Sequence, residues 1–158
     1  MKREEFAEAY AFFVAAKDFC DFIDRHQVFV NLDGFKSLFE RLSALYRAGY
    51  SLALVDVDFD FSTCKAITKP VLEIKQYDAY WEVFDPYHLD EPLIGELSDD
   101  LSDIYIELKK GLQIYQKDKA EALWYWKFGF DSHWGFHAID ALRALHYVIF
   151  RELDSDDE

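Results

Sequence analysis

The spacing of apolar residues limits what this chain can fold into more than any other feature. Phe6, Ala9, Phe13 and Ala16 recur at alternating steps of three and four, which is the period of an α-helix. The same period returns along most of the chain, but a single straight helix over residues 118–153 would be about 50 Å long, too long for a compact domain. We therefore predict a break near 129–135, and helices over residues 4–24, 33–48, 69–84, from 98 onward, from 118 to the break, and 132–153.

The composition agrees with an all-helical fold. Hydrophobic residues make up 51% of the 158-residue chain and aromatic residues 18%, which is enough for a large core without disulfides or metal. Only 6 Gly and 3 Pro are present, too few for the turns of a β-sandwich or barrel. We predict an all-α fold, a compact bundle of five or six helices that forms one domain over residues 1–153, followed by an acidic, frayed tail over 154–158.

One stretch, residues 51–64, does not follow the helical period. Apolar residues alternate there with aspartates, which is typical of a short strand or an extended loop. A lone strand would have no partner, so we expect an irregular or short extended acidic segment. The aspartates resemble a calcium-binding loop, but Phe61 stands where that loop needs Gly, and Ile67 where it needs Glu.

The net charge of −14 at pH 7 narrows the classes of partner. It repels phosphate backbones and anionic lipid surfaces, so we expect neither nucleic-acid nor membrane binding. No run approaches the roughly 20 apolar residues of a membrane span, and no secretory signal follows Met1, so we expect a cytoplasmic protein. Cys20 and Cys64 have no zinc-site spacing. A basic protein or a cation fits the charge, and the oligomeric state stays open.

Residues 76–108 form an acidic aromatic segment, with ten acidic residues and no Lys or Arg. A surface that binds a basic partner combines negative charge with aromatic anchors. The alternative is that the aromatic side chains face the core and the acids form a solvated face. The first hypothesis is a non-enzymatic binding protein for a basic protein partner, such as an immunity-type protein that neutralises a toxin. Its expected contacts are Trp81, Asp85, Tyr87, Asp90, Glu91, Glu96, Asp99, Asp100 and Asp103.

A second hypothesis starts from three residues of the final predicted helix. His133, His137 and Asp140 lie at positions i, i+4 and i+7, so they share one helix face. Two His at this spacing can bind one divalent transition metal, with His26 or His88 as a further ligand. The protein would then be a metal-dependent helical-bundle enzyme or a metal sensor. The simpler interpretation is that these His lie in the helical core, satisfied by hydrogen bonds and without any cofactor.

Motifs of familiar enzymes are absent from the sequence. Trp134 stands where the zincin motif HExxH needs Glu, and there is no Glu-x-x-His signature of di-iron bundles. No nucleophile elbow and no Gly-rich phosphate loop are present. We therefore lean towards a protein that is not an enzyme. A purely structural or self-associating module is the third possibility.

Three stretches of sequence carry a family resemblance. They are Tyr80–Pro86 (YWEVFDP), Leu97–Tyr105 (LSDDLSDIY) and His133–His146, which contains HWGFH and ALRALH. With them the chain resembles the bacterial "domain of unknown function 5063" family over most of its length. The resemblance implies a compact helical domain of bacterial origin, and it implies no activity. Its matched positions are candidates without a role, namely Trp134, Gly135, His137, Arg143 and His146.

Overall fold

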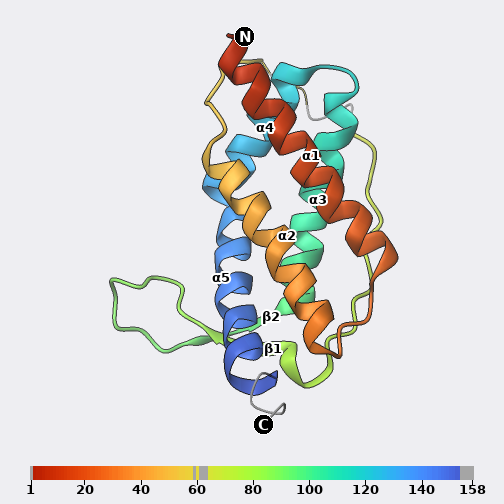
Figure 1. The fold of residues 1–158 in the computed structure, drawn as a ribbon. Helices are drawn as coiled ribbons and strands as arrows, with labels where there is room; N and C mark the ends of the chain where they lie inside the picture. Colours follow the sequence, from red (N-terminus) through yellow and green to blue (C-terminus); the bar gives the residue numbers. More distant parts are fainter. Residues whose placement is uncertain (1, 59, 61–63, 154–158) are drawn as a thin grey trace.

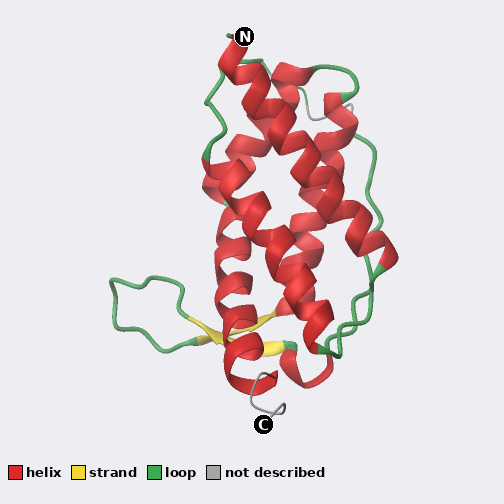
Figure 2. Cartoon of the chain, in the orientation of Figure 1, coloured by secondary structure: helices red, strands yellow, loops and turns green. Residues whose placement is uncertain are grey.

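The chain forms α-helices and one small hairpin in a computed structural model that describes residues 2–58, 60 and 64–153 (Figures 1 and 2). In chain order the elements are α1 (Arg3–Arg25), α2 (Leu32–Tyr50), a 3₁₀ turn (Lys75–Tyr77), β1 (Ala79–Glu82), β2 (Leu93–Glu96), α3 (Leu97–Tyr115), α4 (Lys119–Ser132), α5 (Trp134–Tyr147) and a terminal π-helical turn (Val148–Leu153). The predicted helical bundle is confirmed, because the described strands form only a two-stranded sheet. No helix of the described part is long and apolar enough to cross a membrane. The tail predicted over 154–158 lies outside the described residues.

The helices pack as a ring of antiparallel neighbours. α1 contacts α2 and α3, and α5 contacts the same two helices from the other side. In Figure 1, α1 runs down from the N-terminus, α2 and α3 both run up, and α4 and α5 descend to the C-terminus. The chain must therefore return along the bundle between α2 and α3. Residues 51–74 make that return, and those of them that the structure describes form neither helix nor strand.

Local signals in the sequence set where helices begin and break. Asn31 caps α2, because its side-chain Oδ1 accepts a hydrogen bond from the backbone N–H three residues on (2.9 Å). Asp118 caps α4 in the same way (3.0 Å). The helical pattern that follows is broken at His133, inside the predicted interval 129–135. The predicted break is confirmed, and it divides one long helix into α4 and α5.

The helix predicted over residues 69–84 is wrong. This stretch contains the 3₁₀ turn and β1, which pairs antiparallel with β2. Just before them, the N–H of Glu73 donates to the carbonyl of Gln27 (2.8 Å), and the carbonyl of Glu73 accepts from the N–H of Phe29 (2.9 Å). These long-range bonds use the backbone groups that a helix would need, so tertiary pairing outweighs the local apolar period. The Tyr and Trp of β1 also favour a strand.

Large aromatic side chains fill the core, and helical glycines make room for them. Trp126 and Trp134 are fully buried, and the Trp134 indole N–H donates to the Trp126 carbonyl (3.0 Å). The Trp126 ring lies against Gly111 in α3, where an added Cβ would be 1.8 Å from Nε1. A Cβ at Gly135 would be 2.2 Å from the Phe130 carbonyl oxygen. Two of the family-motif residues, Trp134 and Gly135, therefore serve packing.

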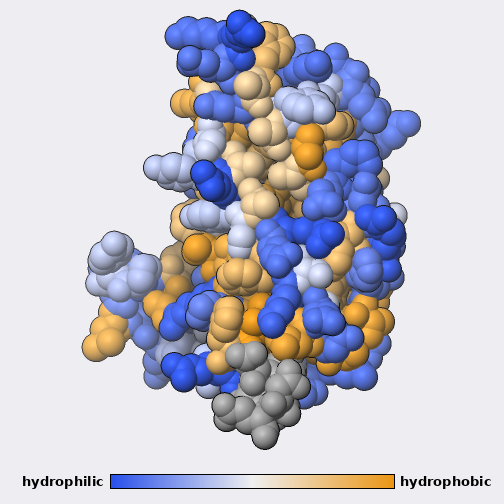
Figure 3. Space-filling view, viewed as in Figure 1, coloured by the Kyte–Doolittle hydropathy of each residue, from blue (hydrophilic) through white to orange (hydrophobic). Residues whose placement is uncertain are grey.

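Residues 83–92 form an arm that connects β1 with β2 and projects from the bundle (Figure 1). Phe84 and Tyr87 of the arm are 89% and 94% exposed, and Trp81 of β1 is 69% exposed. In Figure 3 the arm stands clear of the body and carries both hydrophilic and hydrophobic side chains. The alternative in which the aromatic side chains of the acidic aromatic segment face the core is wrong for these three residues.

Candidate metal centre

Acidic side chains of α3 face two His at the start of α5. Asp100, Asp103 and Glu107 are spaced by three and four residues, so they lie on one face of α3. His133 is at the break between α4 and α5, and His137 follows one turn later. Because α3 packs against α5, the two sets of side chains meet.

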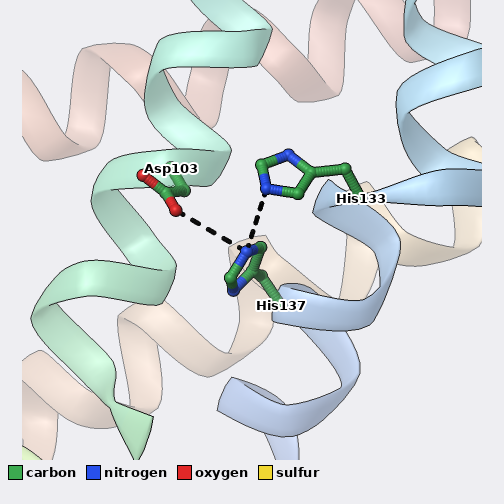
Figure 4. A group of neighbouring side chains, drawn as sticks. All are labelled: Asp103, His133 and His137. Atoms are coloured by element: carbon green, nitrogen blue, oxygen red, sulfur yellow. Dashed lines mark hydrogen bonds and ion pairs between the residues drawn. The ribbon is translucent and has the colours of Figure 1, made fainter.

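His133, His137 and Asp103 lie together in a group that we call the metal cluster (Figure 4). The Nε2 atoms of the two His are 3.2 Å apart, and Nε2 of His137 is 3.6 Å from Oδ2 of Asp103. One ligand atom from each residue lies within 4.8 Å of the other two. Figure 4 shows Asp103 on α3 opposite the two converging rings. The structure therefore brings together both predicted His, with Asp103 in the place expected for Asp140.

A further carboxylate is hydrogen-bonded to Nδ1 of each His ring, on the side away from the metal cluster. Nδ1 of His137 lies 2.7 Å from Oδ1 of Asp100, and Nδ1 of His133 is hydrogen-bonded to Oε1 of Glu107. An ionised carboxylate only accepts, so each Nδ1 carries the proton and donates it. In neutral rings each Nε2 is then a lone-pair acceptor, and the two lone pairs face each other across 3.2 Å. This contact is repulsive unless a proton or a cation lies between the nitrogens.

Asp100 is the buried end of this network, at 4% exposure. Its Oδ2 accepts a hydrogen bond from the Tyr80 hydroxyl (2.5 Å). The hydrogen bond with Asp100 raises the pKa of His137 against the opposing effect of burial. Burial and Asp100 raise the pKa of Tyr80, which keeps its hydroxyl protonated as a donor. Asp100 thus orients His137 inside the protein, and its predicted place on a partner surface is wrong.

A cavity of about 770 Å³, which we call the hairpin pocket, lies between the hairpin and α5. Aromatic side chains line it from both sides, among them Trp81, Phe84, Phe136 and Tyr147. Asp140 lines this pocket and is not part of the metal cluster. Burial, followed by the carboxylates of Glu82 and Asp100, raises the pKa of Asp140 to about 6.

The other residues predicted to contact a basic partner are spread over the hairpin and the start of α3. Asp85 is half-buried and pairs with Nδ1 of His88 on the arm (2.6 Å). Asp103 belongs to the metal cluster. The exposed members are Trp81, Tyr87, Asp90, Glu91, Glu96 and Asp99.

Neither His suggested as a further metal ligand joins the metal cluster among the described residues. Nδ1 of His26 lies 3.1 Å from a backbone carbonyl of its own helix, and His88 is on the arm. The last two family-motif residues also lie apart from the cluster. Arg143 lines the hairpin pocket, and His146 packs beside Phe150, with ring centroids 4.7 Å apart.

Three carboxylates of the site are missing from the predicted ligands, namely Asp100, Asp103 and Glu107. Their spacing was a usable signal, since acids at steps of three and four on α3 match His at a step of four near α5. The acidic face of one helix and the His face of its antiparallel neighbour can therefore lie against each other.

The fold and the site define an antiparallel helical-bundle protein with a His–carboxylate cluster between two helices. The family model "Domain of unknown function (DUF5063)" matches residues 3–151, so the chain belongs to that family, which confirms the resemblance. The crystal structure of protein BF1032 from Bacteroides fragilis is similar, with a TM-score of 0.73 and 19% identity over 91% of this chain and 93% of that chain. At this identity the likeness shows the fold alone. No curated protein matches the chain.

Proposed function

We propose that this protein binds one divalent transition-metal ion at the metal cluster and depends on it for its activity. The observation that carries the proposal is the pair of Nε2 atoms of His133 and His137, 3.2 Å apart. Each ring is held from behind by a carboxylate, and metal-binding His usually donate their other N–H in this way. A metal ion between the rings would bond to both nitrogens, in place of the proton that must otherwise lie between them.

The distances between donor atoms suit a tetrahedral ion. Zinc–nitrogen bonds of about 2.0–2.1 Å place two nitrogens of a tetrahedron about 3.3 Å apart. Nε2 of His137 lies 3.2 Å from Nε2 of His133 and 3.6 Å from Oδ2 of Asp103, and the three ligand atoms all lie within 4.8 Å of one another. Side-chain adjustment would bring them to the edge lengths of a tetrahedron. Two imidazoles and one carboxylate favour zinc or a similar transition metal over magnesium or calcium.

Three protein ligands leave a coordination position for solvent or for another ligand. The side chains of His133 and Asp103 are 48% and 29% exposed, so an ion there would face water. Structural zinc sites have four protein ligands, whereas catalytic sites have three and an open position. This arrangement supports metal-dependent chemistry or metal sensing over a purely structural ion.

Calorimetric titration of untagged, chelator-treated protein with zinc, nickel and manganese tests the proposal, together with elemental analysis of the purified protein. His133→Ala is the test variant because this side chain is exposed, and His88→Ala on the arm is the matched control. We expect one ion per chain in the wild type and the control, and affinity at least about 100-fold lower in His133→Ala. Wild-type protein without stoichiometric binding, or His133→Ala with unchanged affinity, would overturn the proposal.

The exposed arm favours a second function, which is binding of a basic protein partner. Phe84 and Tyr87 are almost fully exposed, and Asp90 and Glu91 lie on the same arm. Aromatic anchors beside acidic side chains are what such a surface needs. Neither comparison names a partner, so the immunity-type role and the cytoplasmic location stay predictions.

Charge reversal on the arm tests this second function. The basic products of neighbouring genes would be co-expressed with the wild type, with Asp90→Lys/Glu91→Lys, and with Glu40→Lys on α2 as control. A one-to-one complex that is lost at high salt and in the arm variant would support it. A complex that forms equally well with the arm variant would show that the arm is not the interface.

A further inference from the structure

We propose that the hairpin pocket binds a small organic cation, a primary or quaternary amine carried on an apolar or aromatic body. The volume of about 770 Å³ falls within the 300–1,000 Å³ typical of small-molecule sites. The proposed metal ligands do not line this pocket. Ligand binding at this pocket is therefore independent of the proposed metal centre.

Exposed aromatic rings line the pocket on two sides. Trp81 and Phe84 of the hairpin are 69% and 89% exposed, and Phe136 and Tyr147 on the α5 side are 62% and 58% exposed. All four line one cavity although they come from distant parts of the chain. Large apolar side chains left exposed together mark a binding site, and the faces of such rings attract ammonium groups.

The acidic side chains of the pocket supply the charge that selects a cation. Among the described residues that line the pocket, Glu82, Asp140 and Glu152 are acidic and Arg143 alone is basic. Asp140 takes part in none of the ion pairs found among the described residues. Burial and the nearby Glu82 and Asp100 carboxylates disfavour its charged form, which the neighbouring His137 and Arg143 offset only in part. A bound ammonium group would provide the missing partner.

The remaining residues that line the pocket indicate that the uncharged part of the ligand is apolar. Ile139, Ala144 and Val148 add aliphatic surface to the aromatic rings. An inorganic cation would leave this surface in contact with water, whereas an amine with an apolar body would cover it. An anion would meet three carboxylates and one guanidinium, so it is disfavoured.

Three compounds of matched length test the proposal by NMR titration. They are 4-phenylbutylamine, neutral 4-phenylbutanol and anionic 4-phenylbutyrate. We expect the amine to shift the indole signal of Trp81 and to bind at least about tenfold more tightly than the alcohol, with the carboxylate weakest. Asp140→Asn should weaken amine binding about tenfold and leave alcohol binding unchanged, while Glu40→Gln on α2 should change neither.

Several results would overturn binding of an organic cation at the hairpin pocket. Equal binding of the amine and the carboxylate, unchanged amine affinity in Asp140→Asn, or no amine binding up to about 10 mM would overturn it. A lysine-rich peptide that binds through Asp140 while the free amine does not would also overturn it, in favour of a protein interface. Thermal unfolding of Asp140→Asn checks that the variant is folded, and Glu82→Gln gives a second removal of charge from the same pocket.

Discussion

Replacement of Gly111 by Ala tests whether the helices approach as closely as the structure places them. The new Cβ would be 1.8 Å from Nε1 of Trp126 and 2.4 Å from its Cε2, whereas an ordinary contact is about 3.5 Å. The Trp126 ring is fully buried and packs on Phe12 and Tyr115, with ring centroids 4.8 and 5.7 Å away. The variant must therefore separate α3 from α4 or push this ring into its neighbours.

Two effects of opposite sign set the change in the free energy of unfolding. Ala favours a helix interior over Gly by about 1 kcal/mol. Overpacking of a filled core costs about 1–3 kcal/mol, and we take the upper end because the Trp126 ring is fully buried in the core. We expect Gly111→Ala to lose about 2 kcal/mol, which lowers Tm by roughly 4–8 °C in a domain of this size.

Urea unfolding followed by circular dichroism measures this loss, and a double-mutant cycle with Trp126→Phe identifies its cause. Phenylalanine lacks Nε1, the atom nearest to the new methyl group. We expect the double variant to be more stable than the sum of the single changes predicts, by about 1 kcal/mol or more. A Gly111→Ala variant as stable as the wild type, or strictly additive changes, would refute the reasoning.

Three further predictions concern single side chains. Asp140→Asn should stabilise the protein by about 1 kcal/mol at pH 7, because the folded state raises the pKa of Asp140 to about 6 and so disfavours its charged form. The carboxyl already holds its proton in the folded state at about pH 4, so urea unfolding there should show little gain, and an equal gain at both pH values would contradict the cause. Asn31→Ala should cost about 1 kcal/mol in the same assay through loss of the α2 cap, and Asn31→Ser should restore most of it. Burial raises the pKa of Cys20 to about 12, so in Cys64→Ser the remaining thiol should react with Ellman's reagent at pH 8 only after denaturant is added, and reaction in the folded state would place Cys20 outside the core.

The helices could be predicted because each apolar face repeats within its own segment. The predictions over 4–24 and 33–48 lie within two residues of α1 and α2. The hairpin depends on partners far along the chain, since Glu73 bonds to the loop after α1 and β1 pairs with β2. Over these residues the apolar spacing suits a helix and outweighs the weaker strand preference of Tyr80 and Trp81, so the local sequence does not reveal the strand pairing.

The two His of the site could be predicted because they are four residues apart. The third ligand is harder to assign, because the spacing of the acids on α3 shows that they share one face, but Asp103 reaches the two His only through the packing of α3 on α5. The expectation for Asp140 assumed one continuous helix through His133. Because α5 begins after His133, the i to i+7 relation does not hold there, and Asp140 lies in the hairpin pocket.

Residues 51–74 connect two parts of the bundle that pack against each other. α1 packs on α3 and α2 packs on α5, so neither residues 2–50 nor residues 75–153 can cover their aromatic faces alone. We expect a chain cut within residues 51–74 to give two fragments that regain the fold only when they meet. The start of α1 and the end of the terminal π-helical turn lie at opposite ends of the bundle (Figure 1). The architecture is thus suited to a split reporter, in which reassembly of the core signals that two fused proteins have come together.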